Sequence, residues 1–234
     1  SGLPPAHLHD LEGVLRNSLR EHRFRIDGSP DAELGERISI RGRFRQPLLS
    51  NQAGVWEDWS GQAYVASSQI NLAAWARHGV ATWGLPPTQG HGWMRAWLEW
   101  RAGALQQVSV DAEVKGLRTE WRTSPTHTRT LALASAQGRI TWVPGPKEHW
   151  TLQHAQLSPG DLTPWKIGLA EVAIQRSADG QVLAGEGQID RVDLSSLNAF
   201  KGWVPEEGSA LWAQMEPKGA LTQVKWRWQG SREN

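Results

Sequence analysis

Hydrophobic and polar residues alternate with a period of two along much of the chain. In residues 37–44, Ile38, Ile40 and Phe44 fall on one side of an extended segment, and arginine and serine side chains fall on the other. Residues 107–115 repeat this alternation, with valines opposite acidic and polar side chains. A period of two is typical of a strand with one face in water. The pattern therefore predicts strands that each carry one apolar face.

Clusters of Gly, Pro, Asn and Asp separate further segments of strand-forming composition. We predict additional strands at residues 11–16, 23–26, 62–70, 93–100, 130–134, 139–143, 151–157, 166–176, 181–190 and 221–229. Many short strands with turn signals between them are typical of an all-β protein. No helical pattern alternates with these segments, so a parallel α/β sheet is not expected.

Two short segments, residues 71–77 and 193–200, break the period of two. Each begins with a residue of the N-cap type, Asn71 or Asp193, and then places apolar side chains three or four positions apart. This spacing predicts one or two helical turns in each segment. Both predicted helices directly follow a strand.

The sequence after each predicted helix is similar, at an offset of 116 residues. The identities are Gly92 with Gly208, residues 103–105 with 219–221, and residues 107–108 with 223–224. We infer an internal repeat with approximate units at residues 54–121 and 165–230. Repeated supersecondary units favour one continuous array over residues 1–234 rather than two independent globules.

Composition excludes several classes of protein. The chain has 234 residues, 39% of them hydrophobic, which is long enough to bury about 70% of its unfolded surface. A formal net charge of +1 argues against nucleic-acid binding, which needs a strongly basic footprint. The absence of Cys excludes disulfides, thiol nucleophiles and Cys-ligated zinc. No stretch approaches the ~20 apolar residues that span a bilayer. The start at Ser1-Gly2 is typical of a cloning scar or of an excised fragment.

The sequence offers no specific catalytic motif. The eight His residues show no metal-ligand spacing, and no nucleophile elbow or phosphate-binding glycine loop occurs. Asp111 and Glu113 alternate with valines, so we interpret them as the solvated face of a strand rather than an acid/base pair. We therefore expect no catalytic residue, no metal site and no cofactor.

The 15 Trp residues are the unusual feature of the composition. Three interpretations stay open at this point. The Trp side chains pack in a core and keep their N–H groups at its rim, or they form platforms on which sugars stack, or they line the mouth of an apolar channel.

The order of these motifs resembles the periplasmic AsmA-like proteins, and in particular their YhdP-type members. The residues that carry the resemblance are 59–65 leading into 69–75, and then 93–100 with Gly-Ala-Leu at 103–105, all after the strand at 37–44. It covers about residues 8–229. The resemblance implies an all-β fold, an elongated, strongly curved and mostly antiparallel sheet with two short helices, built from repeats as a groove or half-open β-taco.

The resemblance also implies a function. YhdP-type proteins of Gram-negative bacteria are anchored in the inner membrane and carry phospholipids through the periplasm toward the outer membrane, without a catalytic centre. This chain would be a fragment of the large periplasmic region. Its expected partners are phospholipid acyl chains, and the two membranes or their proteins through parts of the parent chain not present here; nucleic acid is not expected.

An apolar groove fits the alternation of the strands, because a dry sheet face must be covered by a second layer or by something apolar. Our candidates for groove-lining residues are Ile38, Ile40, Phe44, Met94, Leu98, Val108, Val110, Val114, Leu131 and Leu133. Such an aliphatic lining has no polar clamp to discriminate among lipids. The alternatives are a Trp-rich carbohydrate-binding β-sandwich and an envelope scaffold that transports nothing.

Overall fold

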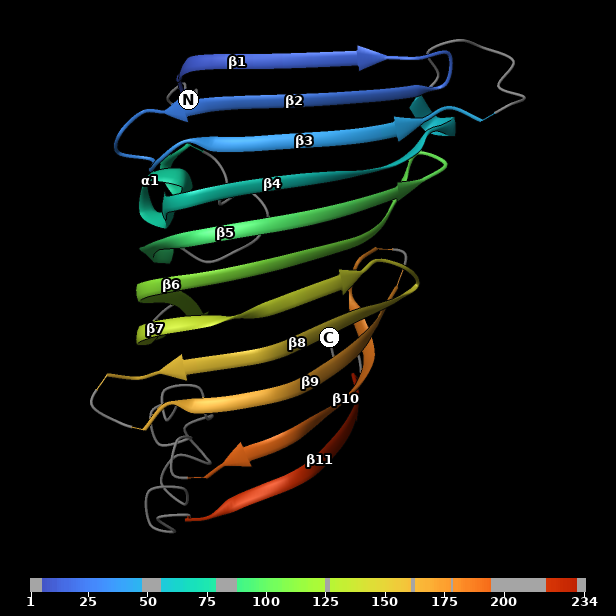
Figure 1. Ribbon diagram of the computed structural model, residues 1–234. Coiled ribbons are helices and arrows are strands. Elements are labelled where there is room, and N and C mark those ends of the chain that lie inside the picture. The colour runs from blue at the N-terminus through green and yellow to red at the C-terminus, as the bar shows by residue number, and fades with distance from the viewer. Residues whose placement is uncertain are drawn as a thin grey trace.

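A computed structural model describes residues 6–47, 56–78, 88–124, 127–160, 163–177, 179–194 and 218–230. In this part of the chain eleven strands form one sheet, in which each strand pairs with its neighbour in the sequence. Figure 1 shows the strands side by side from β1 to β11, with the last strands inclined relative to the first. A progressive inclination is the normal twist of a sheet.

Every pairing between neighbouring strands is antiparallel, and β1 and β11 lie at the two edges of the open sheet. The strands are β1 (Leu8–Asn17), β2 (Glu21–Pro30), β3 (Ile38–Arg45), β4 (Ser60–Asn71), β5 (Thr88–Arg101), β6 (Ala104–Ser124), β7 (His127–Val143), β8 (Lys147–Ser158), β9 (Trp165–Arg176), β10 (Val182–Asp193) and β11 (Ala220–Gln229). The predicted all-β, antiparallel architecture is confirmed.

One predicted boundary is wrong. Residues 130–134 and 139–143 are not two strands, because β7 runs through both of them and pairs with β6 within each. Gly138 lies between the two predicted segments. In the structure this glycine allows a close approach, since a Cβ atom there would lie 3.0 Å from the Cα of Ala155 on β8.

The described residues contain one short α-helix, α1 (Leu72–Arg77), and a single 3-10 turn, η1 (Trp56–Asp58). The helix α1 confirms the first of the two predicted helices, and Asn71 caps it by accepting a hydrogen bond from the Ala74 N–H. The second prediction is not confirmed: Asp193 ends β10, and residues 195–200 lie outside the described residues. Neither described helix is long and apolar enough to cross a membrane.

A small core holds α1 against the loop between β2 and β3. Leu34 in that loop is fully buried, and its carbonyl accepts hydrogen bonds from the Asn71 N–H and from Trp75 Nε1, at 2.9 and 3.0 Å. A second cluster lies in the C-terminal half of the sheet, around Ala155 and Ile167. The repeat units at residues 54–121 and 165–230 stay a prediction.

Candidate functional site

Residues that face each other across neighbouring strands form rows that run across the sheet. One row, here called the central row, contains one residue from each of the eleven strands. Its members are Leu15, Phe24, Gly42, Ala63, Leu98, Val108, Trp142, Trp150, Val172, Gly187 and Trp226. Direct cross-strand partners point to the same side of a sheet. The central row is therefore an unbroken line of apolar residues from one sheet edge to the other.

A second row lies two residues further along each strand, on the same side of the sheet. Its members are Gly13, Ile26, Ile40, Val65, Ala96, Val110, Ile140, Leu152, Ala170, Ile189 and Val224. This row contains no polar residue either. We call the side of the sheet that carries both rows the apolar face.

The opposite side, the polar face, has a different chemistry. The residues between the two rows point there because side chains alternate along a strand. They are Val14, Arg25, Arg41, Tyr64, Trp97, Ser109, Thr141, Thr151, Glu171, Gln188 and Lys225. The sheet thus separates an apolar surface from a charged and hydroxyl-rich one over its full width.

Large side chains of the apolar face are accessible. Leu15 is 68% exposed, Ile140 is 48% exposed and Trp226 is 38% exposed. In the described part of the chain no second sheet lies over them, since all eleven strands belong to one sheet. A contiguous apolar surface of this kind on a protein marks a site of interaction.

The N-terminal end of the apolar face is hollowed into a cavity of about 610 Å³. Leu15, Phe24, Phe44 and Trp100 supply most of its apolar lining. The ring of Phe44 lies 6.1 Å from that of Phe24 and 5.8 Å from that of Trp100. Such packed aromatic rings give the cavity, here called the apolar hollow, a wall suited to hydrocarbon.

Ion pairs and aromatic contacts hold the polar face together. Arg139 on β7 donates to both carboxylate oxygens of Asp111 on β6, at 2.5 and 2.8 Å. The hydrogen bond from Arg139 lowers the pKa of Asp111. The same guanidinium lies over the ring of Trp97, 5.4 Å from its centroid, and Tyr64 packs beside that ring. These residues form a cross-strand cluster on four adjacent strands, β4 to β7.

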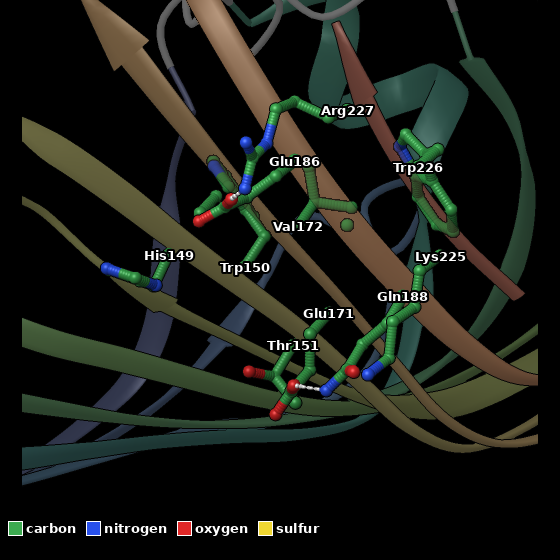
Figure 2. A pocket seen from close by; sticks show the side chains of 12 residues that line it. His149, Trp150, Thr151, Glu171, Val172, Glu186, Gln188, Lys225, Trp226 and Arg227 are labelled. Atoms are coloured by element: carbon green, nitrogen blue, oxygen red, sulfur yellow. Dashed lines mark hydrogen bonds and ion pairs between the residues drawn. The ribbon is translucent and has the colours of Figure 1, made fainter. Parts of the chain in front are cut away.

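A polar cavity of about 670 Å³ lies between strands β8 and β11. Figure 2 shows its paired side chains, with Arg227 directed at Glu186 and Gln188 directed at Glu171. Glu186 also accepts a hydrogen bond from Lys147, which lowers the pKa of the carboxyl group. Because Glu186 is paired with Lys147 and Arg227 and Glu171 accepts from Gln188, the acidic groups of this cavity belong to a network of ion pairs and hydrogen bonds.

Residues 5–233 match the YhdP protein family. The chain belongs to the YhdP family. The match covers both edge strands and therefore the whole described sheet, and it confirms the resemblance drawn from the sequence. No curated protein and no solved structure gave a match. Within the described residues, no group of three or more His, Asp or Glu side chains is placed to hold a metal ion.

The register of this YhdP-family sheet brings eight of the ten predicted lining residues to one side. The central row contains Leu98 and Val108, and the second row contains Ile40 and Val110. Ile38, Met94, Phe44 and Val114 lie in the flanking rows of the same face. Of these eight, only Phe44 lines the apolar hollow.

The remaining two candidates lie elsewhere. Leu131 and Leu133 on β7 pair with Thr119 and Leu117, beyond Gly116. Gly116 has a φ of 61°, a left-handed conformation at which two residues of β6 oppose one of β5. Such a bulge interrupts the alternation, so these leucines do not belong to the rows described above. Leu133 is buried, at 4% exposure.

His22, Phe24, Trp59 and Trp100 line the apolar hollow but are not among the residues predicted from the sequence. Phe24 and Trp100 could have been predicted as apolar-face residues, because they continue the alternation of apolar and polar residues in their strands. His22 and Trp59 gave no such signal. The Trp residues divide between the faces, with Trp142 and Trp150 on the apolar face and Trp97 on the polar one.

Proposed function

We propose that this chain is a segment of a periplasmic bridge that carries phospholipids toward the outer membrane along its apolar face. The observation that carries the proposal is the pair of apolar rows that cross all eleven strands. Neighbouring strands lie about 4.8 Å apart, so ten steps between strands give a path of about 48 Å. Half of a bilayer's hydrocarbon core is about 15 Å deep, and the path is therefore about three times as long as one leaflet is deep.

The chemistry of the rows suits a sliding ligand. Moving an acyl chain out of water contributes about 0.8 kcal/mol for each buried CH₂ group. Because the rows offer only apolar contacts, a chain that moves from one strand to the next exchanges equivalent contacts. We further propose that the sheet is an elongated, strongly curved groove or half-open β-taco that wraps around the acyl chains.

Membership of the YhdP family supports a place in the cell envelope. We propose that the parent protein is anchored in the inner membrane and that its periplasmic region includes this sheet. Contacts with the two membranes, or with proteins in them, would be made by other parts of the parent chain. The role we propose is not enzymatic and needs no cofactor or metal.

Site-specific photo-crosslinking in cells tests this function. Probes at Ile40 and Val110, which share the second row, are expected to form phospholipid adducts. Matched probes at Arg41 and Ser109, their neighbours on the polar face, are expected to form none. Absence of adducts at both apolar positions, in cells where a known lipid carrier gives them, would overturn the proposal.

The same experiment separates the alternatives. Equal adducts on both faces would indicate nonspecific adsorption of lipid, and protein adducts in place of lipid would favour a scaffold covered by another protein. The β-sandwich alternative predicts two packed sheets, whereas the described strands form one. Carbohydrate binding in a single-sheet form would appear as glycan binding that Trp97→Ala removes, and we expect no such binding.

A further inference from the structure

Near the start of β2 the side chains on the apolar face change from apolar to charged. The change takes place over the two rows that follow the central row toward the turn between β1 and β2. Along β2, Phe24 lies in the central row and His22 in the flanking row with Phe44. Arg20 extends this register by one more pair, because its carbonyl accepts a hydrogen bond from the Gln46 N–H at 2.9 Å. Alternation places Arg20 on the side of His22 and Phe24. Two residues along a strand span about 7 Å.

Three side-chain nitrogens at this margin have no hydrogen-bond partner. Arg20 Nε, His22 Nε2 and Trp59 Nε1 are buried side-chain nitrogens without a hydrogen bond. They are half of the six such atoms among the described residues. A buried polar group left without a partner costs about 1–3 kcal/mol. Arg20 Nε and Trp59 Nε1 can only donate, so they indicate a ligand that supplies the missing acceptors.

The donors are held in place by other contacts. The rings of His22 and Trp59 stack with their centroids 4.6 Å apart and their planes 4° from parallel. His22 Nδ1 lies 3.1 Å from Asn17 Oδ1 and donates to it, and Arg20 Nη2 lies 3.5 Å from the Gln46 carbonyl oxygen. His22, Trp59 and Asn17 also line the apolar hollow. The polar margin and the apolar hollow are thus parts of one site.

The charge around the margin favours an anion. Arg23, Arg43 and Arg45 at the same end of strands β2 and β3 all share a single carboxylate, that of Glu21. The hydrogen bonds from Arg43 and then Arg23 lower the pKa of Glu21. Alternation along β2 and β3 places these three arginines and Glu21 on the polar face, behind the hollow. Together with Arg20 they leave an excess of positive charge at this end of the sheet, which raises the local concentration of anions.

We propose that this margin binds the phosphate of a phospholipid whose acyl chains enter the apolar hollow. The inference rests on the proposed lipid-carrying function and adds a headgroup site to it. A phosphodiester offers acceptor oxygens only, and it matches Arg20 Nε and Trp59 Nε1, which can only donate. His22 positions the Trp59 indole through the ring stack. The lipid would enter with its phosphate at the sheet margin and its chains along the rows.

Calorimetric titration of the 234-residue chain tests the site with two short-chain lipids that share their acyl chains. Dihexanoyl phosphatidylglycerol, below its micellar concentration, is expected to bind at least about tenfold more tightly than dihexanoylglycerol, which lacks the phosphate. Arg20→Gln is expected to weaken phosphatidylglycerol binding about tenfold and to leave dihexanoylglycerol binding unchanged, because the lining of the hollow does not include Arg20. Trp59→Phe also alters the wall of the hollow, so it is expected to weaken the binding of both lipids, with a loss about tenfold larger for phosphatidylglycerol. The Phe side chain preserves the stack on His22 while it removes the N–H group.

Arg41→Gln and Trp97→Phe on the polar face are the matched controls, and we expect both to bind like the wild-type chain. Circular dichroism checks that each variant is folded. Equal affinity for the two lipids, unchanged by Arg20→Gln and Trp59→Phe, would overturn the headgroup site and leave the apolar path intact. Binding of neither lipid would overturn the proposed function itself. Inorganic phosphate bound as tightly as phosphatidylglycerol would assign the margin to free anions and not to lipid.

Discussion

The indole ring of Trp228 occupies the space that a side chain at Gly185 would fill. The two residues are direct partners in the pairing of β11 with β10. The same relationship recurs between Trp226 and Gly187 and, at the other end of the sheet, between Phe24 and Gly42. Aromatic rings laid over glycines of a neighbouring strand cover bare backbone with apolar surface. Glycine is therefore part of the construction of the apolar face and does not weaken it.

The first prediction concerns this arrangement. Gly185→Ala places a methyl group within the volume of the Trp228 ring and displaces it, and we expect a loss of about 1–3 kcal/mol in the free energy of unfolding. Urea denaturation followed by tryptophan fluorescence measures the loss. Gly13→Ala is the matched control, since a Cβ atom there meets nothing within 4 Å, and we expect a change within about 0.5 kcal/mol. Equal effects in the two variants would contradict the ring-over-glycine account.

A charge placed in a row should interrupt lipid binding. Val110→Glu puts a carboxylate in the middle of the second row, where an acyl chain would have to desolvate it. We expect retention of a fluorescent phospholipid by the purified chain to fall by about tenfold, the equivalent of about 1.4 kcal/mol. Ser109→Glu adds the same charge one residue away on the polar face and is expected to leave retention unchanged. Retention that survives Val110→Glu would argue against the row as the path.

The pairing of Asp111 with Arg139 predicts a dependence of stability on pH. The pKa of Asp111 is lowered in the folded state, so its contribution is present above the ordinary carboxyl pKa of about 4 and is lost as pH falls through the lowered value. The side chain of Arg139 is 46% exposed, and the pair is therefore expected to contribute only about 0.5–1 kcal/mol at pH 7. Urea denaturation of the wild type and of Asp111→Asn should show this difference at pH 7 and a smaller one below pH ~4. A difference that is constant with pH would rule out the ion pair as its source.

Leu34 offers a test of the small core around α1. Because its side chain is fully buried, Leu34→Ala leaves a cavity, and we expect a loss of about 2–5 kcal/mol in the free energy of unfolding. Leu19→Ala removes the same atoms from a side chain that is 97% exposed, and we expect a change within about 0.5 kcal/mol. Thermal melting of both variants makes the comparison. If Leu34→Ala changed the free energy of unfolding only slightly, the packing of α1 would contribute little to the stability of the sheet.

The alternation of side chains predicted the strands well because it is a local property. Ile40 and Val110 were both assigned to an apolar face from their own segments, and their strands form as expected. That the two residues share one row follows only from the register of three strand pairings. Register depends on contacts between segments far apart in sequence, and a single sequence gives little information about it.

The less regular parts of the site were not predictable in the same way. Leu131 and Leu133 continue an apolar pattern, but the bulge at Gly116 separates them from the rows. The stack of His22 on Trp59 joins β2 to a residue just before β4, and neither side chain belongs to a local apolar pattern. Such contacts arise where regular alternation ends, and the unpartnered donors lie at these same positions.

The two apolar rows run perpendicular to the strands. The length of the apolar face along these rows, here called its reach, therefore depends on the number of strands and not on the number of residues. Each strand adds one residue to each row and about 4.8 Å to its length, whatever the length of the loops. Insertion or deletion of one antiparallel hairpin would change the reach by about 10 Å while every other side chain kept its face. Selection could therefore adjust the distance covered by duplicating hairpins, without redesigning the surface along which a ligand moves.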